Sequence, residues 1–68
     1  MTEELMLIIN LRNASLSHKK NCNENCEVSL MMLRNAAIYI GNGLLAKRNS
    51  HDPDVREANR YIEEMPIS

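Results

Sequence analysis

A periodic stripe between residues 24 and 47 constrains the fold of this chain more than any other feature. Apolar or small residues recur there at intervals of 4, 3, 4, 3 and 4 positions, namely Cys26, Leu30, Leu33, Ala37, Ile40 and Leu44. This is the spacing of a helix that packs along its length against other helices. A long helix is therefore expected over residues 24–47, with this stripe in the core.

The segment Gly41-Asn42-Gly43 stands against a continuous helix at that point. Asn-Gly is a turn signal, and each glycine in a helix interior costs about 1 kcal/mol relative to alanine. The apolar stripe nevertheless keeps its phase from Ile40 to Leu44. We therefore predict a continuous or locally bent helix, and a helix that ends at Ile40 is the alternative.

Two further helices are predicted from start and stop signals. The first spans residues 2–17, with Thr2 as its N-cap and acidic residues in its first turn, where the helix dipole favours them. The third spans residues 53–65, because Asp52 is a good N-cap, Pro53 suits the first helical position and Pro66 limits the far end. The polar segment between the first two helices reads as a solvated connection.

The whole chain, residues 1–68, is expected to form one small all-α domain of three helices. It has only two Gly, two Pro and two aromatic residues, which favours a few long elements over many short strands. A lone core of this size rarely supplies more than about 3–5 kcal/mol of stability. Because the first helix is apolar on more than one side, we expect the bundle to be completed by dimerisation.

Charge and hydropathy restrict the compartment and the partners. The formal net charge is −1, so no dominant attraction to nucleic acid is expected. No apolar run of 18 residues is present, so no membrane span is predicted. The acidic start, Met1-Thr2-Glu3-Glu4, differs from a secretory leader and makes the cytoplasm the expected location. Cysteines are normally reduced there.

The residues His18, Cys22 and Cys26 would share one helix face if the segment were helical, and with His51 they are weak candidates for a zinc site. The simpler interpretation makes Cys26 a small core residue and leaves Cys22 and His18 exposed. A Cys22–Cys26 disulfide is a third option; it would close a very short loop and stabilise the fold little. We predict no metal site and no cofactor.

Catalysis is not expected. The sequence contains no paired carboxylates, no phosphate-binding loop and no zinc-protease motif. A chain of this size also has little room for a water-excluding pocket of the usual volume.

Surplus apolar residues are the candidates for a protein interface. Some lie beside the main stripes, and methionines among them suit an adaptable binding surface. With so little chain to cover them, we expect a partner to bury Met6, Leu7, Leu11, Met31, Met32 and Tyr39.

A second possibility is a small DNA-binding accessory protein. The second and third helices could mimic a helix-turn-helix, with Lys47, Arg48, Arg56 and Arg60 at the phosphates. Neighbouring carboxylates in and beside the third helix would oppose such binding.

The sequence therefore predicts a non-enzymatic helical interaction module. Its partners would be a second copy of itself and an unidentified protein, and its role that of a regulator, adaptor or inhibitor. Small size and the lack of a catalytic constellation resemble accessory proteins of bacteria and their phages, which is an analogy of size and style.

Overall fold

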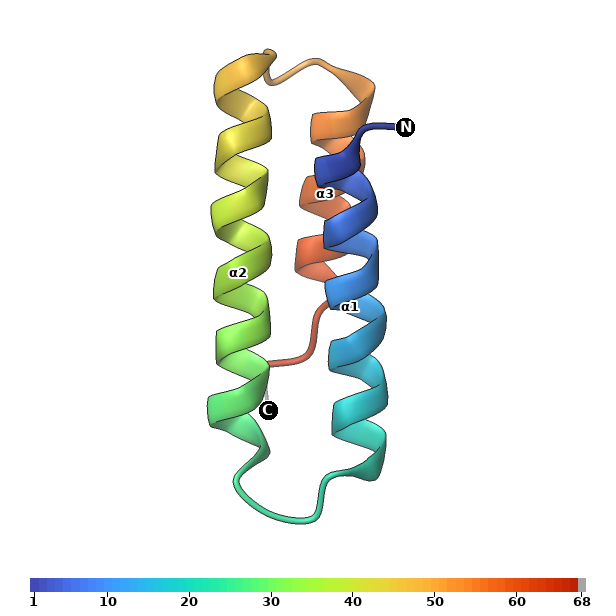
Figure 1. The fold of residues 1–68 in the computed structure, drawn as a ribbon, viewed down its shortest axis with the longest axis vertical. Coiled ribbons are helices and arrows are strands. Elements are labelled where there is room, and N and C mark those ends of the chain that lie inside the picture. The colour runs from blue at the N-terminus through green and yellow to red at the C-terminus, as the bar shows by residue number, and fades with distance from the viewer. Residues whose placement is uncertain (68) are drawn as a thin grey trace.

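A computed structural model, which describes residues 1–67, contains three helices and no strand within that range. They are α1 (Glu3–Asn21), α2 (Cys26–Lys47) and α3 (Pro53–Glu63). Figure 1 shows α1 and α2 as an antiparallel pair that runs the length of the molecule, with α3 packed beside the upper half of that pair. The predicted all-α, three-helix fold is confirmed.

The predicted helix starts are confirmed at α1 and α3. The Oγ1 atom of Thr2 accepts a hydrogen bond from the Leu5 amide at 3.1 Å. The Oδ1 atom of Asp52 accepts one from the Asp54 amide at 2.9 Å, and Pro53 occupies the first helical position. Each cap satisfies an amide that has no partner within its own helix.

Three helix boundaries differ from the predicted ones. Helix α1 continues to Asn21 rather than ending at residue 17, which places His18, Lys19 and Lys20 in a last turn where the dipole favours cations. Helix α2 begins at Cys26 rather than at residue 24. Helix α3 ends at Glu63 rather than at residue 65, in a turn whose two glutamates oppose the dipole.

Helix α2 runs without interruption through Gly41-Asn42-Gly43, as the phase of the stripe predicted. Gly41 faces the rest of the bundle. A Cβ atom at this position would lie 3.1 Å from Cδ1 of Ile62 and 3.9 Å from Cδ1 of Ile8. Gly41 therefore does not form a turn. Its missing side chain leaves the space that α3 needs to approach α2 closely.

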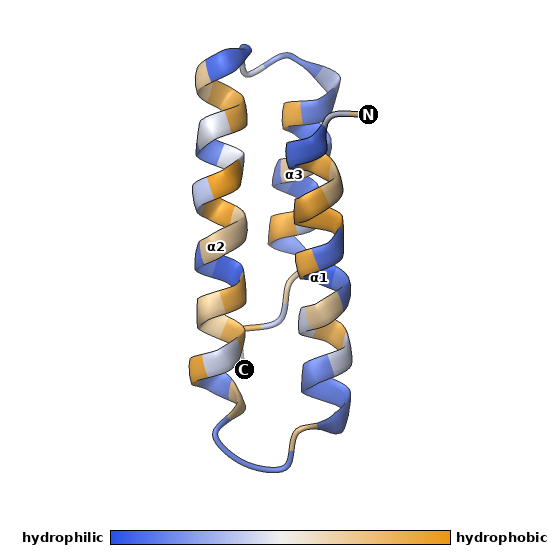
Figure 2. Ribbon diagram, in the orientation of Figure 1, coloured by the Kyte–Doolittle hydropathy of each residue, from blue (hydrophilic) through white to orange (hydrophobic). Residues whose placement is uncertain are grey.

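The core lies where the three helices meet. Of the predicted stripe, Leu30, Ala37 and Leu44 are buried, whereas Leu33 and Ile40 are partly buried at its edge. In Figure 2, apolar residues of all three helices face the interior, and α2 also carries apolar residues on its outer surface. Leu30 is buried outside the core cluster, which joins Ala37 and Leu44 to Leu5, Ile8, Val55, Ala58, Ile62 and Met65.

The lower half of the α1–α2 pair is packed differently, because α3 does not extend along it (Figure 1). Leu16 of α1 lies in this half and is exposed. The buried position belongs instead to Ser15, whose hydroxyl donates to the Leu11 carbonyl oxygen at 2.9 Å. A buried hydroxyl satisfied by its own helix needs no partner from another element.

None of the helices in residues 1–67 combines the length and the apolar character that a membrane crossing requires.

Candidate protein-interaction surface

Five of the six residues predicted to form an interface are exposed. The exposed fractions are 82% for Tyr39, 68% for Met32, 52% for Met31, 51% for Met6 and 50% for Leu7. Leu11 is the exception, since it is partly buried and packs against the core cluster. Exposure of so many large apolar side chains on so small a protein is the main structural feature available for function.

These residues do not share one face. Successive residues of an α-helix are about 100° apart, so neighbours in sequence point in different directions while positions four or seven apart align. Leu7 therefore aligns with Leu11 on α1, and Met32 aligns with Tyr39 on α2. Met6 and Met31 each project from another side of their helix.

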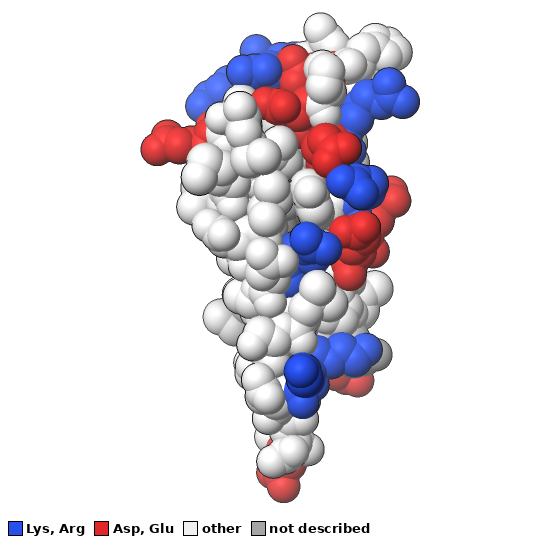
Figure 3. Space-filling view, turned by 90° about the vertical axis from the view of Figure 1, so that its right-hand side faces the viewer, with Lys and Arg blue, Asp and Glu red and all other residues white. Residues whose placement is uncertain are grey.

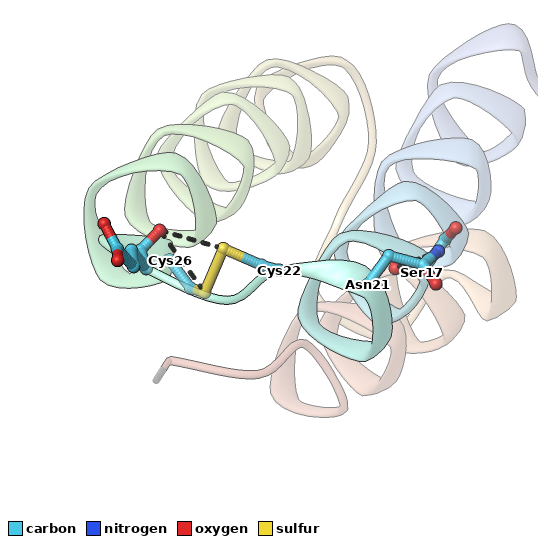
Figure 4. Close-up of a disulfide and its surroundings, with 5 residues drawn as sticks. Ser17, Asn21, Cys22 and Cys26 are labelled. Carbon is cyan, nitrogen blue, oxygen red and sulfur yellow. Dashed lines mark hydrogen bonds between the residues drawn. A yellow bond between two sulfur atoms is a disulfide. The ribbon is translucent and has the colours of Figure 1, made fainter.

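Cys22 and Cys26 form a disulfide across the turn between α1 and α2 (Figure 4), with their Cα atoms 6.0 Å apart. Both cysteines are partly buried, and Cys26 is the first residue of α2 rather than a core residue. The interpretation that places Cys26 in the core is therefore wrong, and of the three options for the cysteines the disulfide is the one found in the structure. Extension of α1 to Asn21 leaves a four-residue turn whose two ends bring the sulfurs together.

The disulfide also bears on the weak zinc candidates. Zinc binds thiolates, and sulfurs bonded to each other supply none. Within residues 1–67, no group of three His, Cys, Asp or Glu side chains converges as metal ligands would. His18 is partly buried rather than exposed, and its Nε2 atom is buried without a hydrogen-bond partner in the described part of the chain.

Three of the four cations proposed for nucleic acid contact already pair with carboxylates. Lys47 Nζ lies 3.0 Å from Glu4 Oε2. Arg48 Nη1 lies 3.1 Å from Asp52 Oδ2, and Arg60 Nη2 lies 2.6 Å from Glu57 Oε2. Only Arg56 has no ion pair among the residues that the structure describes.

These pairs shift the ionisation of their members. The hydrogen bond from Lys47 lowers the pKa of the Glu4 carboxyl. Desolvation raises the pKa of Asp52, but hydrogen bonds from the Asp54 amide and from Arg48 outweigh it, so the net pKa is lowered. The hydrogen bond to Glu57 raises the pKa of Arg60. Each shift favours the charged form, as expected for ion pairs at the surface.

A stacked group at the α1–α3 contact was not predicted. The guanidinium groups of Arg12 and Arg60 lie over the ring of Tyr61, at 4.8 and 4.9 Å from its centroid. Arg12 Nη1 also bonds Glu64 Oε1 at 3.1 Å. No local pattern in the sequence indicated that Arg12 and Tyr61, which lie on different helices, would meet.

The hollows on the described surface are open and shallow. One, of about 440 Å³, is lined by Pro53, Arg56, Glu57 and Arg60 on the outside of α3. Its two arginines and its glutamate are surface residues of one short helix, which offers no water-excluded position for a substrate.

No protein-family model matches this chain, and neither a curated protein nor a solved structure is significantly similar to it.

Proposed function

We propose that this protein is a non-enzymatic helical interaction module that self-associates, with a regulatory, adaptor or inhibitory role. One observation carries the proposal: ten large apolar side chains are exposed among residues 1–67, five of them on α2. Exposed apolar side chains that align along one face of a helix, as Met32 and Tyr39 do on α2, form a patch of the kind that marks an interaction site.

Stability supports the same interpretation. A domain of 68 residues buries only about 60% of the surface of its unfolded chain, and its core alone rarely supplies more than about 3–5 kcal/mol. A partner that covers the exposed side chains and binds only the folded chain adds to that stability by mass action. The intrachain disulfide closes only a short loop, so it does not replace such a partner.

Light scattering coupled to size-exclusion chromatography tests the proposal. We expect a mass of two or more chains of 7.8 kDa at high concentration, falling toward one chain on dilution. Addition of a thiol reductant should leave the assembly in place, because the disulfide joins residues of one chain. A single-chain mass at every concentration would contradict self-association.

The DNA-binding alternative has weaker support. Three of its four cations are held by carboxylates, and in Figure 3 Lys, Arg, Asp and Glu side chains are intermixed rather than separated by sign. A phosphate-binding surface is normally a cluster of unpaired cations. Binding to duplex DNA at low salt, weakened by replacing Arg56, would restore this alternative.

A further inference from the structure

One side of the α1–α2 pair is not covered by α3. Helix α3 reaches the pair through Ile62, which lies against Gly41 of α2, and through Glu64, which bonds Arg12 of α1. The opposite side, which we call the broad face, runs the length of both long helices (Figure 1).

Helix α1 contributes a regular line of residues to the broad face. Its members are spaced 4, 3 and 4 positions apart and lie about 100–160° around the helix from Arg12, which marks the α3 side. Two of them are exposed and two are partly buried. They are Leu7, Leu11, Ala14 and His18.

Helix α2 contributes a matching line with the same spacing. It lies about 140–180° around the helix from Gly41, so it points away from α3. All four members are exposed, and a Cβ atom added at Gly43 would meet no atom within 4 Å. They are Met32, Ala36, Tyr39 and Gly43.

The two lines are in register. Glu4 pairs with Lys47, and Ile8 is the α1 residue that lies against Gly41, so positions that sum to about 50 are level in this antiparallel pair. Each line therefore has a counterpart at the same height: Leu7 with Gly43, Leu11 with Tyr39, Ala14 with Ala36, and His18 with Met32.

This arrangement gives the broad face a particular shape. At its centre, Ala14 and Ala36 are both small, which leaves the backbone accessible to a neighbouring helix. Toward the ends stand the larger side chains of Leu7, Tyr39 and Met32. Small residues beside larger ones leave holes on this face that side chains of another pair of helices can enter.

Neither line contains Lys, Arg, Asp or Glu, so the centre of the broad face is uncharged, and the Glu4–Lys47 pair lies beyond Leu7 and Gly43 at one end of it. Figure 3, which looks onto α1, shows an uncharged expanse on the side away from α3, whereas charged side chains gather at the upper end and along the opposite side, with others toward the lower tip. A strongly charged partner is therefore not expected here, because charge depletion is typical of the centre of a stable interface.

The size of the broad face indicates the occupant. The backbone measures 39 Å by 16 Å, so the face covers about 600 Å² (length times width), near the lower limit of about 600 Å² per partner for a stable interface. One partner helix, about 10 Å wide, would cover no more than about 400 Å². A surface of two helices is needed, and a second broad face supplies one of equal length with the same spacing.

We propose that the broad face is the dimer interface, and that two copies pack broad face against broad face to form a four-helix core from their α1–α2 pairs. This inference rests on the proposed self-association and specifies its surface. Met6 and Met31 lie outside this interface, whereas Leu7, Leu11, Met32 and Tyr39 lie within it.

Charge insertion tests the surface. Ala36→Glu places a carboxylate at the centre of the broad face, at an exposed position where glutamate is a good helix former, so the monomer should fold. In the dimer that charge would be buried without a partner, and the dimer Kd should rise by about 10- to 100-fold. Leu7→Glu, on α1, should act in the same direction.

Asn59→Glu is the matched control, because it adds the same charge at an exposed position of α3. It should leave the Kd within about twofold of the original. Sedimentation equilibrium gives the Kd, and far-UV circular dichroism confirms that each variant remains helical.

The outcomes separate this inference from the proposed function. Loss of dimer in both broad-face variants, with the control unchanged, supports it. A dimer that tolerates Ala36→Glu and Leu7→Glu but not Met31→Glu would overturn the broad face and leave self-association intact. A single-chain mass for the unmodified protein would overturn both.

Discussion

The Cδ1 atom of Ile62 lies 3.1 Å from the point that a Cβ atom on Gly41 would occupy. This relationship accounts for a glycine in the middle of a continuous helix, because the absence of a side chain at Gly41 lets α3 approach α2 closely. Gly43, two positions further along α2, has open space where its Cβ atom would be. The two glycines should therefore respond differently to the same substitution.

Gly43→Ala should raise the free energy of unfolding by about 0.5–1 kcal/mol, because it removes backbone entropy from the unfolded chain without a clash. Gly41→Ala should gain clearly less, since Ile62 must shift to accept the methyl group. Urea denaturation, at a concentration where the chain is monomeric, measures both. An equal gain in the two variants would show that the contact with Ile62 is unimportant.

Leu30 and Leu33 are both members of the predicted core stripe, but they differ in how deeply they are buried. Leu30 is fully buried and Leu33 is partly buried. Leu30→Ala should cost about 2–5 kcal/mol, enough to unfold much of a domain of this size, and Leu33→Ala should cost less. Thermal melts followed by circular dichroism compare them, and a larger loss for Leu33→Ala would contradict the assigned packing.

Local signals in the sequence predicted much of this fold. The apolar residues on either side of Gly41 keep the same helical period, and this correctly predicted a continuous helix through a segment that resembles a turn. Thr2, Asp52 and Pro53 marked helix starts that the structure confirms. Helix ends were harder to predict than helix starts. His18, Lys19 and Lys20 lie in the last turn of α1, where the helix dipole favours cations. This effect is too weak to be recognised in a sequence with three asparagines close by.

Features that depend on how helices meet could not be predicted in the same way. The exposure of Leu16 follows from α3 being too short to cover the lower half of the α1–α2 pair (Figure 1). The stack of Arg12 and Arg60 on Tyr61 needs residues from two helices. The disulfide was one of three options for Cys22 and Cys26, and choosing it required the true end of α1, which lies four residues beyond the predicted one.

Replacing both cysteines by serine, Cys22→Ser with Cys26→Ser, should lower the free energy of unfolding by at most about 2 kcal/mol, because the bond closes a loop of only a few residues. Helix content should stay nearly unchanged, since α1 and α2 pack along their full length. Comparison of the oxidised protein, the reduced protein and the double variant by denaturation checks this. A fully unfolded double variant would mean that the disulfide holds the fold together.

Asp52 should make the free energy of unfolding depend on pH in the acidic range. Its pKa is lowered in the folded protein by the Asp54 amide and by Arg48, so its contribution is present above the ordinary carboxyl pKa of about 3.9 and is lost as pH falls through the lower folded value. Asp52→Asn should therefore be less stable than the original protein at pH 7, with the difference shrinking below about pH 4. A difference that grows on acidification would contradict the assigned hydrogen bonds.

Small-angle X-ray scattering across a concentration series tests the central claim, self-association through the broad face, most directly. Forward scattering should rise to the mass of two chains, while the longest dimension stays near the 39 Å backbone length plus side chains, because the copies lie side by side. A one-chain mass at all concentrations, with a radius of gyration near the 12.1 Å of the single backbone, would contradict self-association. A two-chain particle much longer than one copy would contradict the broad face as the interface.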